Sequence, residues 1–354
     1  MAQSMAQAVA QAVAHAKGHA MGHATAQPTG PLSVLVVDHA AALSPARPLP
    51  RSLRRQGDLL WRALLSDLGA LPGIDVATAA SLDAAPGAGM FDAVWPLVLE
   101  SGGALECLSR DILRGRRILL GSAPATVGVT ASKLALTCAL AAGGVATVAT
   151  CSPHTPVMRA HPTSTTVTKR AAPDDCGPWV VKPDDGAGCL QTRLFRDRAA
   201  ALAWIRASAV PGYVLQPFVA GKPGSLSLIC CDGVAQVLAC NQERVAMRDN
   251  RFHVLGCVVN GLVDDDGALA HLARQVTAAL PGLWGYVGVS FILTTRGAVV
   301  LDVNPRLTAA YAGLHASIGR NPAALVLDLL SGRGPLPLPA PLGGHRPVSV
   351  DVGS

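Results

Sequence analysis

Aromatic and charged side chains are both scarce in this chain of 354 residues. Aromatic residues make up 4% of the sequence and charged residues 15%, whereas half of the residues are hydrophobic. Soluble domains usually have about a quarter of their residues charged. The core must therefore be built mainly from Ala, Val and Leu, and the length is sufficient for two or three packed units.

The sequence also lacks a basic cluster. Its 29 Lys and Arg residues against 23 Asp and Glu residues give a net charge of +6, but no five basic residues are consecutive. A modest, dispersed positive charge suits an anionic small molecule as well as it suits nucleic acid. Because aromatic and basic residues do not alternate, we expect small-molecule partners and no nucleic acid.

The nine cysteines form neither a CxxC pair nor a zinc-binding spacing. An odd number of unpatterned cysteines is typical of reduced thiols, so a cytoplasmic location is expected. No signal peptide is recognisable in the first thirty residues, where Lys17 is the only lysine and Ala is nearly the only apolar residue. No membrane partner is expected, since the uncharged stretch 134–151 is interrupted by two glycines.

Residues 1–30 are rich in Ala, Gln, His and Gly and are predicted to form a flexible low-complexity tail. His15, His19 and His23 recur every four residues, a spacing that could align metal ligands on one helix face. We favour the solvated tail over a metal site. The Pro/Gly-rich residues 336–354 are predicted to be a second, extended tail.

Between the tails, the pattern of apolar residues changes near residue 125. Short apolar runs alternate with helical patterns over residues 31–125, which predicts a small parallel α/β domain. Residues 126–335 contain several strand-like runs joined by turns at Gly and Asp. The fold class is therefore predicted to be α/β, with more than one domain.

The stretch "VVKPDDGAGC" at residues 180–189 places Lys182 at the end of an apolar strand and before a glycine-containing loop. Glycines let backbone N–H groups approach a phosphate closely, and the lysine adds positive charge. The stretch is not a P-loop, because no GK[ST] follows, and the chain lacks the HRD and DFG motifs of protein kinases. The alternative is an ordinary Asp/Gly turn with an exposed lysine.

Two further stretches carry polar residues at strand ends. In "LQPFVAGKPGS", residues 215–225, a strand breaks at Gln216 and Pro217 and can expose backbone groups to a flat heteroaromatic ring. The alternative is an edge strand interrupted by proline. In "VVLDVNPR", residues 299–306, Asp302 and Asn304 lie two apart and share one strand face.

A carboxylate and an amide oxygen in this spacing are hard ligands suited to Mg²⁺. Arg306, two residues further on, could bind a carboxylate or phosphate bidentately. A strand end with an Asn-Pro turn would explain Asn304 but not Asp302 within an apolar run, because an unpaired buried carboxylate is costly. A functional role is therefore favoured for these residues.

The order of these three stretches resembles the ATP-grasp superfamily over about residues 120–315. Within it, "KPDDGAGC" and "VNPR" are most similar to small carboxylate–amine ligases such as tyramine–glutamate ligase. The resemblance implies an α+β ATP-grasp fold behind the N-terminal α/β domain. Its small subdomain would span 126–195 and its large subdomain 196–335, with the nucleotide clamped between them.

The resemblance also implies roles for individual residues. Nucleotide binding is implied for Lys133, Lys182, Asp185, Gly186, Ala187, Gly188, Gln216, Pro217 and Val219. Metal binding, with Mg²⁺ or alternatively Mn²⁺, is implied for Asp302, Asn304 and Ser290, and catalysis for Arg306 and Lys182. Five positions depart from the usual pattern: Ser132 and Ser290 replace Asp, Gln216 replaces Glu, Pro223 replaces a ribose-binding Glu, and Asp302 stands where Glu is commoner.

The implied activity is an ATP-dependent ligase that joins a carboxylate, with glutamate as the candidate, to an amine through an acylphosphate. The products would be the amide, ADP and phosphate. The alternative is an ATP-binding ATP-grasp-like protein with weak or no ligase turnover, which the residues at 216, 223 and 290 motivate. The expected partners are the two small-molecule substrates, and a homodimer is the default assembly.

Overall fold

The computed structural model describes residues 31–38, 50–85, 91–153, 177–208, 212–332, 335 and 346–353. The predicted tail of residues 1–30, with its three histidines, lies outside the described residues, as does most of the Pro/Gly-rich stretch near the C-terminus. Within the described ranges, no helix is long and apolar enough to cross a membrane.

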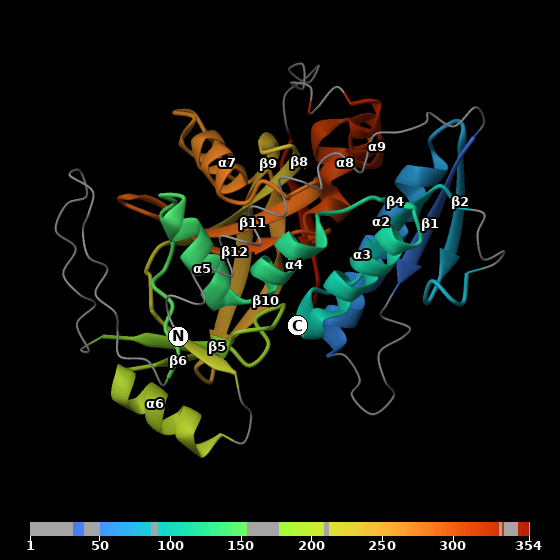
Figure 1. The fold of residues 1–354 in the computed structure, drawn as a ribbon. Helices are drawn as coiled ribbons and strands as arrows, with labels where there is room; N and C mark the ends of the chain where they lie inside the picture. Colours follow the sequence, from blue (N-terminus) through green and yellow to red (C-terminus); the bar gives the residue numbers. More distant parts are fainter. Residues whose placement is uncertain are drawn as a thin grey trace.

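The first unit is built on a parallel sheet with the strand order β2-β1-β3-β4. Both faces of β1 are buried, as expected for a parallel strand between helices. Helix α2 packs on one face and α3 on the other (Figure 1). The elements are β1 (Leu32–Asp38), α2 (Arg51–Gly69), β2 (Ile74–Ala79), β3 (Ala93–Leu97), the 3₁₀ helix η3 (Ser101–Gly103), α3 (Ala104–Arg114) and β4 (Ile118–Leu119).

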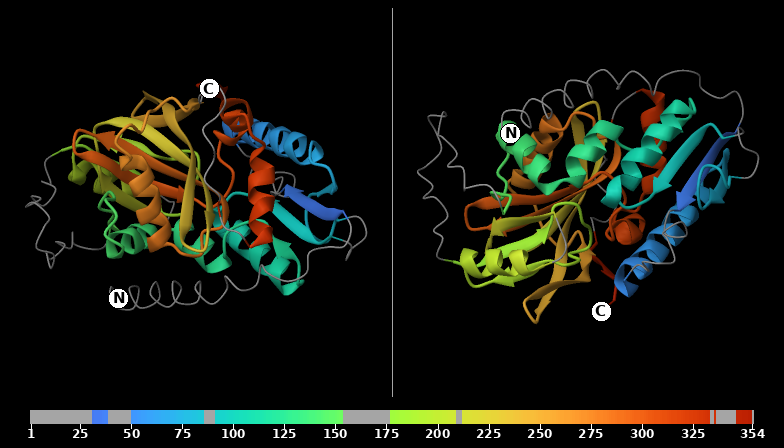
Figure 2. Two further views of the ribbon diagram at one scale, coloured as in Figure 1. Left: turned by 90° about the horizontal axis from the view of Figure 1, so that it is seen from above. Right: turned by 60° about the horizontal axis from the view of Figure 1, so that its bottom comes forward.

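The second unit contains a larger antiparallel sheet with the order β12-β11-β8-β9-β10-β6-β5-β7, and β13 pairs with β10. Figure 2 shows the curl of this sheet from two directions. Its strands are β5 (Trp179–Pro183), β6 (Arg193–Phe195), β7 (Tyr213–Pro217), β8 (Lys222–Cys231), β9 (Val234–Arg248), β10 (Arg251–Val259), β11 (Gly285–Thr294), β12 (Gly297–Asn304) and β13 (Val348–Asp351).

Helices cover this sheet in two groups. Helices α5 and α7 pack on β8, β11 and β12 through an apolar cluster, and α6 packs separately on β5 and β7. The helices are α4 (Pro124–Ala131), α5 (Lys133–Ala142), α6 (Arg198–Ala207), α7 (Ala268–Ala279), α8 (Tyr311–Ile318), α9 (Pro322–Asp328) and the 3₁₀ helix η4 (Leu329–Ser331).

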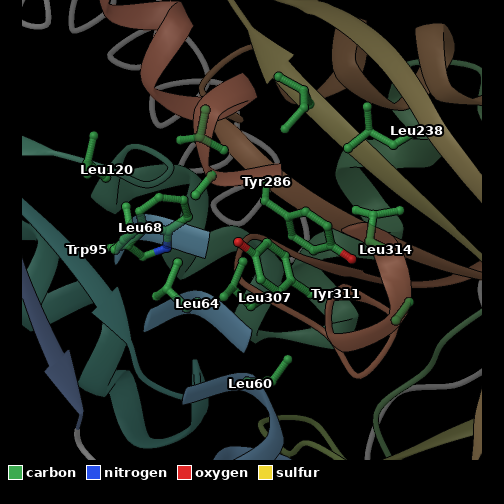
Figure 3. Packing of buried hydrophobic residues seen from close by; sticks show 14 of the residues in the cluster. Leu60, Leu64, Leu68, Trp95, Leu120, Leu238, Tyr286, Leu307, Tyr311 and Leu314 are labelled. Atoms are coloured by element: carbon green, nitrogen blue, oxygen red, sulfur yellow. The ribbon is translucent and has the colours of Figure 1, made fainter. Parts of the chain in front are cut away.

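A single apolar cluster joins the two units. Leu64 and Leu68 of α2 and Trp95 of β3 belong to the same buried cluster as Tyr286 of β11 and Tyr311 of α8 (Figure 3). The two tyrosine rings meet edge to face, with centroids 5.5 Å apart. The first unit is therefore held against the inner end of the large sheet, next to the end of β12.

The predicted α/β class is confirmed: a small parallel sheet precedes a separate, mainly antiparallel unit. Two details differ from the reading of the sequence. Strand β7, beyond the predicted subdomain border at residue 195, returns to pair with β5. Residues Val348–Asp351, predicted to lie in an extended tail, form β13 on the edge of β10.

Candidate nucleotide-binding site

A cavity of about 400 Å³ opens between the β5–β7 strands and the inner strands of the large sheet. It brings together residues from loops and strands that are far apart in the sequence. The predicted site residues that line it are Lys133, Lys182, Gly186, Ala187, Gly188, Gln216, Pro217, Val219, Ser290, Asp302 and Asn304. Asp185 and Arg306 do not line it.

Lys182 is a buried cation at one end of this cavity, on β5. Desolvation lowers the pKa of Lys182 to about 8, although the negative charge of Asp302 opposes this effect. Within the described residues, its ammonium group has no hydrogen bond and no ion pair. Burying a cation without a partner is costly, so the position is poised for an anionic ligand.

Lys133, the second lysine, begins α5 and is also buried. Its Nζ donates to the backbone oxygens of Gly186 at 2.8 Å and Asp184 at 3.3 Å. The same Nζ lies 3.7 Å from Oδ2 of Asp302 on β12. Lys133 therefore connects the glycine-containing loop to the strand that carries the predicted metal ligands.

The loop at 184–188 is anchored by an aspartate that the sequence did not single out. Asp184 accepts a hydrogen bond from Ser132 Oγ at 2.7 Å and another from Leu134 N at 2.8 Å, which fixes it to the start of α5. Asp185 instead accepts from Gly102 N at 2.7 Å and faces the first unit. Adjacent aspartates in a turn look alike in sequence, so no local signal distinguishes the two.

Gly188 is the loop position that most needs to be glycine. Its φ of +63° is in the left-handed region, and a Cβ there would lie 2.6 Å from Leu53 Cδ2 of α2. The loop therefore packs closely against the first unit as well as covering the cavity.

Apolar side chains make up much of the rest of the cavity lining. Gln216 is buried and its Nε2 donates to Thr150 Oγ1 at 2.7 Å, while Phe218 and Met247 are exposed at 39% and 54%. An apolar slot beside a strand end suits a flat heteroaromatic ring. Further apolar residues of the lining are Val180, Val245, Phe252, Val254, Ile292 and Leu301.

The predicted metal ligands meet on neighbouring strands. Ser290 of β11 lies directly opposite Asp302 of β12, so both side chains are on the same sheet face. In the part of the chain that is described, no group of three or more His, Cys, Asp or Glu residues could hold a metal ion. The set fits Mg²⁺ in the mode in which one carboxylate is supplemented by oxygens of a bound phosphate.

A family model described as an ATP-grasp domain matches residues 149–310. Residues 149–310 form an ATP-grasp domain. The match covers β5 to β12, which supply Lys182, the Gln216 strand end and the oxygen ligands; Lys133 lies before it. A comparison with curated proteins gives no match.

Several solved structures are similar in fold to the chain. A protein from Archaeoglobus fulgidus described as an ATP-grasp superfamily member has a TM-score of 0.59 at 18% identity, covering 90% of this chain and 99% of its own. The L-amino acid ligase of Bacillus licheniformis has a TM-score of 0.58 at 18% identity, covering 88% and 76%. The D-alanine–D-alanine ligase of Bacillus anthracis, in complex with ATP, has a TM-score of 0.57 at 13% identity, covering 86% and 100%.

Arg306 does not line the cavity and instead pairs with Glu100, which follows the parallel sheet of the first unit. Its guanidinium binds the Glu100 carboxylate bidentately, with Nη2 and Oε1 3.0 Å apart, and both side chains are buried. Burial would raise the pKa of Glu100, but the charge and hydrogen bonds of Arg306 outweigh it and hold the pKa below its usual value. Nη2 of Arg306 also lies 3.4 Å from Oδ1 of Asn304.

Removing one partner of this pair is expected to destabilise the whole protein. Glu100→Gln would leave the buried Arg306 charge uncompensated, which should cost about 3–5 kcal/mol. Glu106→Gln is the matched control, because Glu106 pairs with Arg110 in a much more exposed setting and should cost less than about 1 kcal/mol. Urea unfolding of both variants measures the difference, and equal losses would show that the buried pair does not join the units.

Proposed function

We propose that this protein is an ATP-dependent ligase that joins a carboxylate to an amine and releases ADP and phosphate. The observation that carries the proposal is the buried ammonium group of Lys182, which has no partner among the described residues, in a cavity whose lining is otherwise largely apolar. A triphosphate at the lysine end and an adenine in the slot would satisfy both ends together. The ATP-grasp domain, and neighbours named as amino acid ligases, support this class of reaction.

In the proposed complex, Lys182 and Lys133 neutralise the triphosphate, and Gly186, Ala187 and Gly188 cover it with backbone N–H groups. Gln216, Pro217 and Val219 border the adenine. Mg²⁺ held by Asp302, Asn304 and Ser290 would supply further neutralisation of phosphate charge when it is bound.

The proposed chemistry has two steps. An oxygen of the substrate carboxylate attacks the γ-phosphorus, the bond to the bridging oxygen breaks, and ADP leaves with that oxygen. The amine nitrogen then attacks the acyl carbon, phosphate leaves, and the nitrogen loses a proton to give the amide. The loop at 185–189 would keep water away from the acylphosphate.

The proposed part of Arg306 follows from its neighbours. Because Glu100 holds its guanidinium, Arg306 can hold the Asn304 amide in a fixed orientation from its present position. A direct contact with the transferring phosphoryl group, which the sequence motif favours, would require Arg306 to leave Glu100. We therefore propose that Arg306, while it is paired with Glu100, is a positioning residue.

The second candidate function is nucleotide binding without ligase turnover. It is favoured by one observation: the residue opposite Asp302 is Ser290, so Asp302 is the only carboxylate among the proposed metal ligands. Weak metal binding would leave the γ-phosphate poorly activated.

ADP release separates the two candidates. The protein is incubated with ATP, Mg²⁺ and a panel of amino acids, glutamate included, each with and without a set of primary amines. We expect ADP release that depends on one carboxylate and increases with one amine. ATP binding without ADP release for any pair would contradict ligase activity and favour the second candidate.

A further inference from the structure

Polar side chains continue from the proposed metal site across the large sheet. Asp302 of β12 lies opposite Ser290 of β11, Ser290 lies opposite Ser225 of β8, and Ser225 lies opposite Asn241 of β9. Residues opposite each other in antiparallel strands share a face. Asp302 and Ser290 line the cavity. Ser225 and Asn241 therefore continue the same sheet face inward from the position proposed for the triphosphate.

Glu243 lies beside this row, two residues beyond Asn241 on β9. Side chains two residues apart on a strand point to the same face. Val245 and Met247, the next two residues of that face, line the cavity together with Ala246, and the register shift between β9 and β10 lies on the β10 side, between Val254 and Gly256. The Glu243 carboxylate therefore faces the same side of the sheet as the cavity, and it lies just beyond the lining residue Val245.

Hydrogen bonds hold the Glu243 carboxylate in a fixed orientation. Ser225 Oγ donates to Glu243 Oε1 at 2.6 Å. The Asn241 amide in turn donates to Ser225 Oγ at 3.2 Å and to Ser227 Oγ at 3.0 Å, and Ser227 contacts the Tyr286 hydroxyl at 3.0 Å. Asn241 and Ser227 are fully buried, so the support behind Glu243 is rigid.

The charge of Glu243 has no protein partner. In the described residues, Ser225 is its only hydrogen-bond donor and no Lys, Arg or His forms an ion pair with it. The side chain is half-buried, and burial raises its pKa, while the bond from Ser225 opposes that effect. A carboxylate that is fixed in a partly buried position without a cation carries a free-energy cost. The position is therefore suitable for a cationic ligand.

Glu243 also acts electrostatically on the nucleotide cavity. Burial raises the pKa of the cavity-lining Cys189, Lys182 lowers it, and the negative charges of Asp302 and Glu243 both raise it. Glu243 is therefore close enough to influence the groups at the triphosphate end, where the reacting carboxylate and amine must meet.

We propose that Glu243 binds the ammonium group of an organic substrate at the inner end of the cavity. This proposal rests on the proposed ligase function and names one recognition element for its substrates. Two substrates could supply the group: the amine that is to be joined, or the α-ammonium group of an amino acid that provides the carboxylate.

Glu243→Gln tests the proposal with little change in shape, since its amide oxygen can still accept from Ser225. The minimal probe is methylammonium chloride, compared at equal ionic strength with tetramethylammonium chloride, which has no N–H donor. We expect methylammonium to raise the melting temperature of the wild type and of the control Glu106→Gln. In Glu243→Gln we expect this rise to be lost and the ligand-free melting temperature to be unchanged or higher.

Paired ligands identify the source of the ammonium group. If the wild type binds L-glutamate more tightly than glutarate and Glu243→Gln does not, the ammonium group belongs to the amino acid. If the wild type binds 2-phenylethylamine more tightly than 2-phenylethanol and Glu243→Gln does not, the ammonium group belongs to the amine substrate.

Equal methylammonium stabilisation of wild type and Glu243→Gln, or none in the wild type, would overturn the proposal. A lower melting temperature of ligand-free Glu243→Gln would also overturn it, since it would show a structural carboxylate. ATP affinity is measured in the same samples and is expected to be equal in wild type and variant. Failure of the wild type to bind ATP would instead contradict the proposed function, so the two failures are distinguishable.

Discussion

Lys182→Met is expected to weaken ATP binding strongly while making the ligand-free protein more stable. The loss of a charge-assisted hydrogen bond to phosphate should cost about 1.5–3 kcal/mol, which is roughly a tenfold to 150-fold weaker affinity. The ligand-free protein should gain stability because methionine removes a buried cation that has no partner within the described residues.

The pH dependence of stability gives an independent check on Lys182. Its pKa is about 8 in the folded protein against 10.5 for the free side chain, so the unfolded chain binds more protons between these values. Wild-type stability is therefore expected to rise from pH 8 to about pH 10 through this group, and the rise should be smaller in Lys182→Met.

Lys222→Met is the matched control, because Lys222 is an exposed lysine on the same sheet. Titration calorimetry with ATP and thermal unfolding at pH 7 and 9.5 measure both effects. The assignment of Lys182 to the phosphates would be contradicted by unchanged ATP affinity in Lys182→Met, or by equal effects in both variants.

Asp302→Ala is expected to abolish Mg²⁺-dependent ADP formation, and Ser290→Asp to lower the Mg²⁺ concentration that is required. Asp302 is the only carboxylate among the proposed ligands, and each anionic oxygen offsets part of the ion's lost hydration. A new carboxylate at 290 would face Asp302 directly across the β11–β12 pair. The wild type should therefore need a high Mg²⁺ concentration for turnover.

ADP formation against Mg²⁺ concentration measures both changes. Thr294→Asp, at the end of the same strand but outside the cavity lining, controls for the added charge. An unmoved or raised Mg²⁺ requirement in Ser290→Asp would show that residue 290 is not beside the metal. Normal turnover of Asp302→Ala would contradict the ligase mechanism itself.

Local sequence patterns were sufficient to predict the fold class and most of the cavity. Lys182 follows an apolar strand, and Asp302 and Asn304 alternate with apolar residues, so strand geometry alone orients them. The resemblance to a known family then connected these stretches, which no local pattern could do. The structure places the residues so identified around one cavity, except Asp185 and Arg306, while their chemical roles remain predictions.

The differences arise where distant contacts outweigh local patterns. The spacing of 302, 304 and 306 suggested one face, but β12 ends at Asn304, and Arg306 turns to Glu100, 206 residues earlier in the chain. Similarly, Val348–Asp351 follows a Pro/Gly-rich stretch and forms a strand only because β10 offers an edge. Glu243 gains its setting from Ser225, on the neighbouring strand.

A crystal structure of the protein with Mg²⁺ and a non-hydrolysable ATP analogue tests the central claim most directly. The account predicts the adenine against Gln216 to Val219, the phosphates between Lys133 and Lys182, and the ion beside Asp302. Nucleotide bound elsewhere would contradict the account. The second cavity of about 550 Å³, lined by Arg193, Trp204 and Arg251 among others, is the clearest rival position.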